Sequence, residues 1–314
     1  MPIIATQGLT MRFPRVTALD DLTVTVPEGV VGLVGANGAG KSTLIKILLG
    51  LLPPTSGRAE VLGLDIAREG MRIRERVGFM PEYECLPPDM SATEFVVHMA
   101  RMCGLPPSAA RERAADTLRH VGLYEERYRP IGGYSTGMRQ RVKLAQALVH
   151  DPSLVFLDEP TNGLDPAGRD EMLALIRRIG ADFGISVLVT SHLLGELERV
   201  CDHIVVVDGG RLLRSQAVDA YTTASGALTV EVEEGRDVLG RHLHDRGVQV
   251  HPEGRHLVVQ VAGEDTYDLI RDGVADLELR LVRLEQRRHR IEEVFTEQQA
   301  PPPGVLPGPP GGPR

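Results

Sequence analysis

The 314-residue chain has few cysteines and no long apolar run. Its three cysteines, Cys85, Cys103 and Cys201, are widely spaced and odd in number. They form neither a disulfide framework nor a CxxC metal pair, which indicates a reducing compartment. The longest apolar run, 44–52, is interrupted by Lys46 and is far shorter than the roughly 18 residues of a membrane span. The first ten residues lack a basic region and an apolar stretch, so we expect no signal peptide.

Positive charge is also in short supply. Lysine and arginine number 35 against 43 aspartates and glutamates, which gives a formal net charge of −8, and only three of the basic residues are lysines. Because affinity for nucleic acids comes mainly from neutralising phosphates, this balance argues against a general DNA or RNA coat, and we expect no nucleic-acid partner. Hydrophobic residues make up 42%, enough for a packed core, and the length suggests about two domains.

The first 215 residues alternate apolar runs with helical patterns. Four continuous apolar runs read as buried strands, at 30–34, 154–157, 186–190 and 204–207. Such runs separated by helices predict an α/β fold with a parallel sheet covered on both faces. Ser91 and Glu94 have the spacing of a capping box. Asp165-Pro166 predicts a helix start, and Gly180 its end.

The composition changes after this region. Residues 216–226 are small and polar and read as a linker. Residues 227–298 then predict a second, α+β domain. Its expected elements are a strand at 228–232, a helix at 236–246, strands at 248–252 and 256–262, a helix at 265–273, a strand at 277–284 and a short helix at 290–298. This βαββαβ order is the ferredoxin-like pattern. The tail, 299–314, is rich in proline and glycine and is predicted to be disordered.

A glycine-rich loop is the strongest functional signal. Residues 35–42, GANGAGKS, match G-x-x-x-x-G-K-S/T, between the predicted strand 30–34 and an apolar helix expected at 43–51. Glycines let successive backbone N–H groups surround phosphates, and the helix N-terminus adds its own donors. The sequence therefore predicts a nucleotide site in which Lys41 reaches the β- and γ-phosphates and the hydroxyl of Ser42 ligates Mg²⁺. The candidate binding residues are Gly35, Asn37, Gly38, Ala39, Gly40, Lys41, Ser42 and Thr43.

Two further segments carry chemistry that suits a nucleotide. The strand 154–157 ends in Asp158 and Glu159, at the sheet edge where open α/β sheets bind ligands. Asp158 suits the outer shell of Mg²⁺, and Glu159 is the candidate general base for the attacking water. Read alone, the pair is equally an ordinary acidic turn. The segment 134–141 offers a Ser hydroxyl, Gly137 and a helix N-terminus, a second possible anion site. By itself it is only a serine-capped helix start.

Taken together, these motifs resemble the ATP-binding-cassette (ABC) ATPases, a family with a P-loop NTPase fold, over residues 3–215. Gly35–Ser42 resembles the Walker A loop. Leu154–Glu159 resembles the Walker B strand followed by the catalytic glutamate. The sequence YSTGM at 134–138 stands where the family has LSGGQ, with Thr136 and Met138 as departures. Further single positions resemble family sites. Phe13 stands where the family has an aromatic ring that stacks on adenine, and Glu82 stands at the Q-loop position, which is usually Gln and lies near the metal. Asp165 resembles the D-loop aspartate, and His192 resembles the switch histidine.

The resemblance implies an ATPase subunit of a transporter. A helical subdomain is expected at about 83–150, and Ser135 and Gly137 are expected to bind the ATP of a second subunit in a head-to-tail dimer, with a homodimer favoured. The departures at 82, 136 and 138, and the ending 283–295, are similar to the subgroup that serves ABC-2-type exporters. We therefore expect separate integral membrane permease subunits, and a peripheral place on the cytoplasmic face of the cell membrane. The segment Glu82–Glu94, with its exposed-looking Leu86, Pro87, Pro88 and Met90, is the candidate docking surface. Two alternatives are a soluble ABC ATPase in DNA repair or translation and a different P-loop enzyme, such as a kinase or GTPase.

Overall fold

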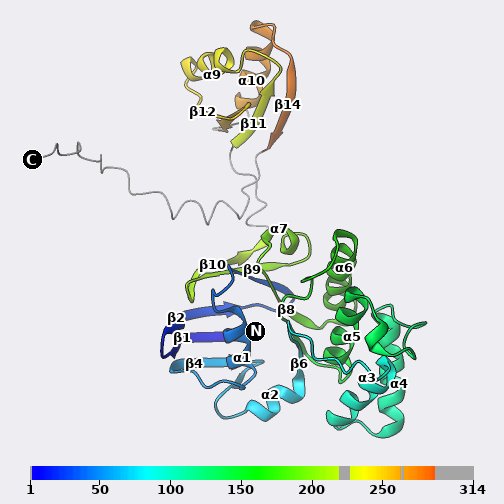
Figure 1. The fold of residues 1–314 in the computed structure, drawn as a ribbon. Coiled ribbons are helices and arrows are strands. Elements are labelled where there is room, and N and C mark those ends of the chain that lie inside the picture. The colour runs from blue at the N-terminus through cyan, green and yellow to red at the C-terminus, as the bar shows by residue number, and fades with distance from the viewer. Residues whose placement is uncertain (1, 219–226, 262, 264, 287–314) are drawn as a thin grey trace, which may run out of the picture. The chain divides into compact units, whose positions relative to one another are not determined.

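The chain forms two compact units, Met1–Val218 and Asp219–Arg314. The computed structural model describes residues 2–218, 227–261, 263 and 265–286 of them (Figure 1). The predicted tail 299–314 and last helix 290–298 lie outside the described residues, as does 219–226 of the predicted linker. Residues 216 and 217, the first two of that linker, belong to a strand.

The first unit is built on a six-stranded sheet. Its order is β10 (Arg211–Ala217), β9 (His203–Asp208), β3 (Val30–Val34), β8 (Ser186–Ser191), β7 (Leu154–Leu157) and β6 (Val77–Met80). Every neighbouring pair is parallel except β9 with β10. Strands β3, β7 and β8 are buried along their whole length, as continuous apolar runs require in a sheet covered on both faces. The predicted parallel sheet is therefore confirmed.

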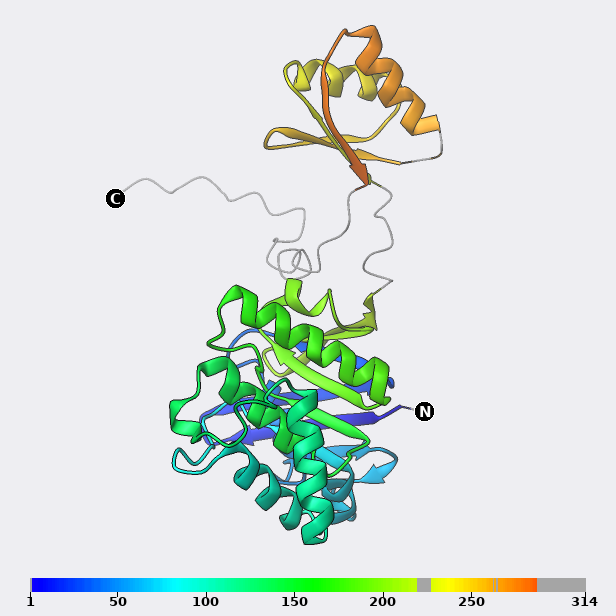
Figure 2. The same ribbon diagram turned by 90° about the vertical axis from the view of Figure 1, so that its right-hand side faces the viewer.

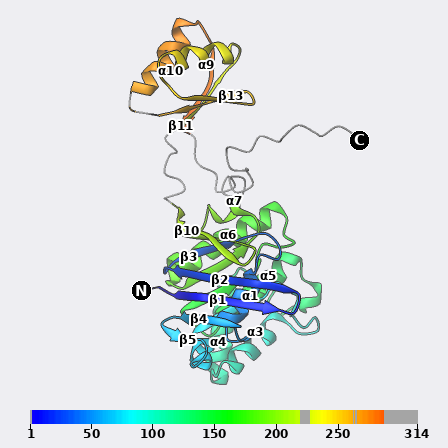
Figure 3. The ribbon, with the colours of Figure 1, turned by 90° about the vertical axis from the view of Figure 1, so that its left-hand side faces the viewer.

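A second sheet, of four strands, adjoins the first helix (Figure 3). Its order is β2 (Val16–Val26), β1 (Ile4–Phe13), β4 (Ser56–Val61) and β5 (Leu64–Asp65), with antiparallel neighbours. Helix α1 (Lys41–Leu48) begins two residues before the expected Thr43, and helix α2 is Gly70–Arg76. Ile45 and Leu48 of α1 share one core with Leu9 and Leu22 of the small sheet and with Leu33 of β3. The strand before the glycine-rich loop and the helix after it are thus held in the same core.

A group of helices occupies the segment from 92 to 148 (Figures 1 and 2). It contains α3 (Ala92–Met102), α4 (Pro107–His120), the 3₁₀ turn η1 (Ile131–Gly133) and α5 (Thr136–Leu148). The predicted capping box is present. Ser91 Oγ accepts from the N–H of Glu94, and the Glu94 carboxylate accepts from the N–H of Ser91. The hydrogen bonds that the Glu94 carboxylate accepts from the N–H and from the hydroxyl of Ser91 lower the pKa of Glu94.

The prediction for the end of helix α6 (Pro166–Phe183) is wrong. Asp165 does cap its start, by accepting from the N–H of Gly168, but the helix passes Gly180 and ends at Gly184, which has a left-handed φ of 64°. A Cβ on Gly180 would lie 2.5 Å from Val30 Cγ2. This glycine therefore allows α6 to pack closely on β3 and does not stop the helix. A short helix, α7 (Leu194–Leu197), follows β8.

The second unit has the predicted ferredoxin-like arrangement. Its elements are β11 (Ala227–Val232), α9 (Arg236–Asp245), β12 (Val250–Glu253), β13 (His256–Gln260), α10 (Asp265–Asp276) and β14 (Leu281–Gln286). The strands form an antiparallel sheet in the order β12-β13-β11-β14. Leu239, Leu243 and Ile270 of the two helices form a core with Leu228 and Val259 of the sheet. In neither unit does a helix of the described residues have the length and apolar character needed to cross a membrane.

Candidate nucleotide site

The glycine-rich loop joins β3 to α1 and needs its glycines for steric reasons. Gly38 and Gly40 have φ values of 87° and 100°, which side chains rarely tolerate. A Cβ on Gly35 would lie 2.4 Å from the carbonyl oxygen of Val207. The loop lines a hollow of about 310 Å³, to which Ala36–Thr43, Ala18, Glu82, Tyr83 and Glu159 contribute. The structure thus brings the predicted loop residues from Asn37 to Thr43 together with two of the predicted carboxylates.

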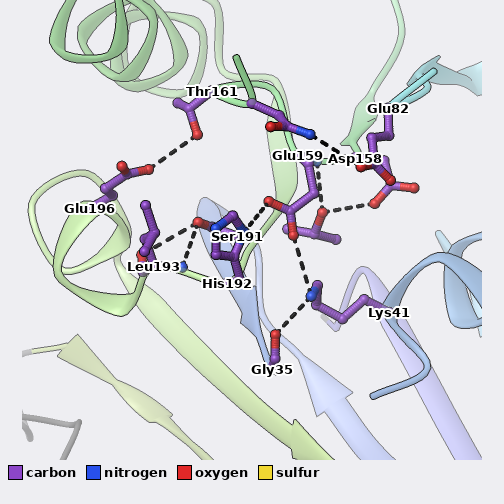
Figure 4. A network of polar contacts seen from close by, with 12 residues as sticks. Gly35, Lys41, Glu82, Asp158, Glu159, Thr161, Ser191, His192, Leu193 and Glu196 are labelled. Carbon is purple, nitrogen blue, oxygen red and sulfur yellow. Dashed lines mark hydrogen bonds and ion pairs between the residues drawn. The ribbon is translucent and has the colours of Figure 1, made fainter. Parts of the chain in front are cut away.

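Lys41 is buried, and its amine faces the loop (Figure 4). Its Nζ donates to the carbonyl oxygen of Gly35 at 2.7 Å and lies 3.3 Å from Oε1 of Glu159. That carboxylate oxygen is buried and makes no hydrogen bond among the described residues. A phosphate bound in the loop would compete with Glu159 for the ammonium group of Lys41.

Asp158 and Glu159 follow β7 and are both buried. The hydroxyl of Thr190 donates to Oδ1 of Asp158 at 2.8 Å and accepts from the N–H of Glu159 at 2.8 Å. Glu159 has a left-handed φ of 49°, which is uncommon for a residue other than glycine. A single buried hydroxyl on the neighbouring strand β8 therefore holds both acidic residues. Thr190 was not predicted as a site residue, although its position directly before Ser191-His192 was a possible signal.

His192 lies on the other side of Glu159 from Lys41. Its Nδ1 donates to Oε2 of Glu159 at 2.9 Å, so the carboxylate is shared between the histidine and the lysine (Figure 4). The side chain of Glu159 is only 8% exposed, whereas that of His192 is 43% exposed. A buried carboxylate with a partly accessible imidazole beside it can accept a proton from a water molecule and keep its orientation.

Glu82 follows β6 and lines the same hollow. Its Oε1 accepts from Nδ2 of Asn162 at 3.2 Å. The backbone of this segment is also held, because Nζ of Lys143 donates to the carbonyl oxygens of Glu82 and Tyr83 at 2.9 and 3.3 Å. Neither Asn162 nor Lys143 was predicted, since nothing in a local motif places them beside Glu82.

Another buried carboxylate links the segment after β8 to the start of α6. Oε2 of Glu196 on α7 accepts from the hydroxyl of Thr161 at 3.1 Å (Figure 4). Its Oε1 lies 2.9 Å from Nη1 of Arg169. Asp165 lies between Thr161 and Arg169. The segment with His192 and the segment with Asp165 are therefore joined by one ion pair and one hydrogen bond.

Ser135, Gly137 and Asp165 lie at a different place, where they line a second hollow of about 570 Å³ with Thr136 and Leu164. Ser135 caps α5, because its Oγ accepts from the N–H of Met138. Phe13 is at the end of β1, 43% exposed, and is not among the described residues that line either hollow. Its predicted stacking on adenine stays a prediction.

The residues at the first hollow fit Mg²⁺ bound together with a nucleotide. No cluster of three or more His, Cys, Asp or Glu side chains that could hold a metal by itself occurs in the part of the chain that the structure describes. Mg²⁺ usually keeps several waters and takes one or two carboxylates plus the phosphates of its substrate. The hydroxyl of Ser42, the N–H donors of the loop and the carboxylates of Glu82 and Glu159 line this hollow, and Asp158 is buried directly before Glu159 in the sequence.

Comparison with known proteins agrees with this geometry. The family model "ABC transporter" matches residues 19–162. The daunorubicin/doxorubicin resistance ATP-binding protein DrrA of Streptomyces peucetius is 37% identical over 243 residues, which are 77% of this chain and 71% of that protein. The bacitracin transport ATP-binding protein BcrA of Bacillus licheniformis is 37% identical, over 69% of this chain and 70% of that protein. The solved structure of cbiO1 from Clostridium perfringens, described as part of an ABC transporter complex, is similar at a TM-score of 0.64 and 28% identity. It covers 70% of this chain and 90% of cbiO1.

Proposed function

The chain belongs to the ABC transporter family as an ATP-binding, ATP-hydrolysing subunit, and we propose that it powers export through separate membrane subunits of the ABC-2 type. The observation that carries the proposal is the line of contacts from Lys41 through Glu159 to His192 over the glycine-rich loop. Binding and hydrolysis residues that come from three separate segments converge there on one carboxylate. The relatives named for drug resistance and bacitracin transport support an exporter.

The predicted site residues have separate tasks in the hydrolysis that we propose. The N–H groups of the loop and the ammonium group of Lys41 bind the phosphates. Glu159 accepts a proton from the attacking water, and His192 orients that carboxylate and reaches the γ-phosphate. Ser42, Asp158 and Glu82 would hold Mg²⁺, which would supply positive charge to the phosphate oxygens.

The working unit in this proposal is a head-to-tail pair of two copies of the chain. Ser135 and Gly137 lie at the N-terminus of α5, outside the hollow of the glycine-rich loop. Such a helix start is an anion site that suits the γ-phosphate held by the other copy. ATP then binds the closed pair better than the open one, which is the difference in affinity that a conformational cycle requires.

The segment Glu82–Glu94 is the surface to which we assign the contact with the membrane partner. Such a contact would place the chain peripherally on the cytoplasmic face of the membrane. Residues 88–93 run beside 127–132 through backbone hydrogen bonds such as Ile131 N–H to the carbonyl of Met90. Tyr83 and Tyr128 are 75% and 69% exposed. Leu86, which the sequence suggested was exposed, is buried, so that part of the expected surface was wrong.

Purification from native membranes tests the proposal. Tagged Glu159→Gln protein is extracted with mild detergent and ATP, and Lys41→Met protein, which lacks the phosphate-binding amine, is the matched control. We expect a polytopic membrane protein in stoichiometric amount with both variants, and a nucleotide-dependent dimer with Glu159→Gln only. Recovery of soluble or ribosomal partners alone, with the protein absent from membranes, would instead establish the soluble ABC ATPase.

A further inference from the structure

One face of α5, together with His150 two residues after its end, carries a row of side chains that donate to backbone carbonyl groups. We call these four residues, Gln140, Lys143, Gln146 and His150, the α5 ladder. Gln140 Nε2 donates to the carbonyl oxygen of Asn162 at 3.2 Å, and Gln146 Nε2 to that of Phe79 at 2.6 Å. His150 Nε2 donates to the carbonyl oxygen of Val77 at 3.0 Å. Lys143 donates to two carbonyl groups, those of Glu82 and Tyr83.

Two members of the ladder, Gln146 and His150, cover an edge of the large sheet. Strand β6 is the last in the sheet order, and the carbonyl groups of Arg76 and Met80 accept from the N–H groups of Ser153 and Asp158. Because carbonyl directions alternate along a strand, those of Val77 and Phe79 face away from β7 and need other donors. Helix α5 can approach closely only because residue 78 is glycine. A Cβ there would lie 1.9 Å from the carbonyl oxygen of Ala147.

Lys143 is the member of the ladder that the composition singles out. The chain uses arginine almost everywhere, yet two of its three lysines are buried, Lys41 in the phosphate loop and Lys143 in α5. Burial lowers the pKa of Lys143, and the nearby carboxylates of Glu84, Glu82 and Asp158 oppose that change. A compact ammonium can direct separate N–H bonds to two successive carbonyl groups, whereas a planar guanidinium cannot match this arrangement without displacing the loop.

The side chain of Glu82 is held from the same helix by a second route. Asn162 donates from Nδ2 to Oε1 of Glu82, and its own carbonyl oxygen accepts from Gln140 of the ladder. Both the backbone and the carboxylate of Glu82 are therefore tied to α5. Ser135, which caps the start of the same helix, lines the second hollow.

We propose that Lys143 is a positioning residue for the ATPase reaction, which fixes the carboxylate of Glu82 at the phosphate-loop hollow and makes it move with the Ser135 end of α5. The proposal rests on the ATP site described above and does not require a membrane partner. Lys143 touches neither nucleotide nor metal in this role and acts only through Glu82.

A double-mutant cycle on the purified full chain tests it. The background is Glu159→Gln, and the variants are Lys143→Met, Glu82→Ala and the pair. Lys46→Met, at an exposed lysine of α1, is the control, and Lys143→Gln, which keeps an N–H donor, replaces Lys143→Met if the latter fails to fold. The measurements are the Kd for ATP with Mg²⁺, the Kd for ATP in EDTA, and the Tm of each variant.

We expect Lys143→Met to weaken binding with Mg²⁺ by about five- to tenfold, and to change binding in EDTA by less than about twofold. In the Glu82→Ala background the same substitution should change binding with Mg²⁺ by less than about twofold. An equal loss in both backgrounds would overturn the proposal, as would a Glu82→Ala variant with unaltered binding. Failure to recover a membrane partner would contradict the exporter and leave this cycle unaffected.

Discussion

The contact between Lys41 and Glu159 leads to the prediction that the carboxylate of Glu159 weakens the binding of ATP. The two groups are 3.3 Å apart, and their side chains are 7% and 8% exposed. At an effective dielectric constant of about 20, unit charges at this distance attract by about 5 kcal/mol before desolvation. Desolvation offsets most of that gain. A phosphate must nevertheless replace Glu159 as the partner of Lys41, so the ion pair weakens ATP binding.

Replacing Glu159 by glutamine removes this competitor and keeps the shape of the side chain. We therefore expect the Kd for ATP in EDTA to stay equal or to fall by up to about tenfold, which is about 1.4 kcal/mol. Hydrolysis should fall by about 10²- to 10⁴-fold, because the general base is lost. Fluorescence titration measures the first quantity and phosphate release the second. Glu112→Gln, at an exposed glutamate of α4, should change neither. A tenfold higher Kd, or unchanged turnover, would refute the reasoning.

Three more predictions concern Thr190, Gly78 and His150. Thr190→Val removes the hydroxyl that holds both acidic residues, and we expect it to cost about 1–3 kcal/mol of stability by chemical denaturation and to slow phosphate release. Gly78→Ala should destabilise the protein by about 1–3 kcal/mol or more, whereas Gly133→Ala, where a Cβ meets nothing within 4 Å, should be close to neutral. Burial lowers the pKa of His150. Since the unfolded chain then binds the proton at a higher pH than the folded one, stability is lost as the pH falls below about 6.5. The fall in Tm between about pH 7.5 and about pH 5.5 should therefore be smaller in His150→Gln than in the wild type. His98→Gln, at an exposed histidine, is the control and should show the same fall as the wild type. Equal falls in the wild type and in His150→Gln would contradict this prediction.

The parts of the fold that the sequence predicted well depend on local physics. Strands 30–34 and 154–157 have the predicted limits because each is a continuous apolar run that is buried on both faces. Ser91 and Asp165 cap their helices because an N-cap needs only the next few residues. The end of α6 could not be predicted in this way. Gly180 is required by a contact with Val30, which is remote in the sequence.

The same distinction separates the predicted site residues from those that were missed. The glycine-rich loop and the pair Asp158-Glu159 are contiguous, so their chemistry can be read from a motif. Thr190 is 31 residues from Glu159, and Lys143 is 61 residues from Glu82. Such residues act through contacts that arise only when strands and helices are assembled. In the sequence alone, Lys143 is conspicuous because lysine is rare in this chain. Nothing in the sequence indicates which residue it contacts.

The departures at Thr136 and Met138 fall where the proposed anion binding uses the backbone and not the side chain. Ser135 caps α5 by accepting a hydrogen bond from the backbone N–H of residue 138. Methionine at this position donates that bond as well as glutamine would. Thr136 is the first residue of α5, and a Cβ built on Gly163 would lie 3.5 Å from its methyl group. Because the hydroxyl oxygen of Ser135 accepts within the cap, its proton stays available for a ligand, and the helix N-terminus keeps its free N–H groups. The altered motif therefore keeps the cap and the helix start on which the proposed anion site depends. What it changes is the surface around that site, where Thr136 and Leu164 line the second hollow.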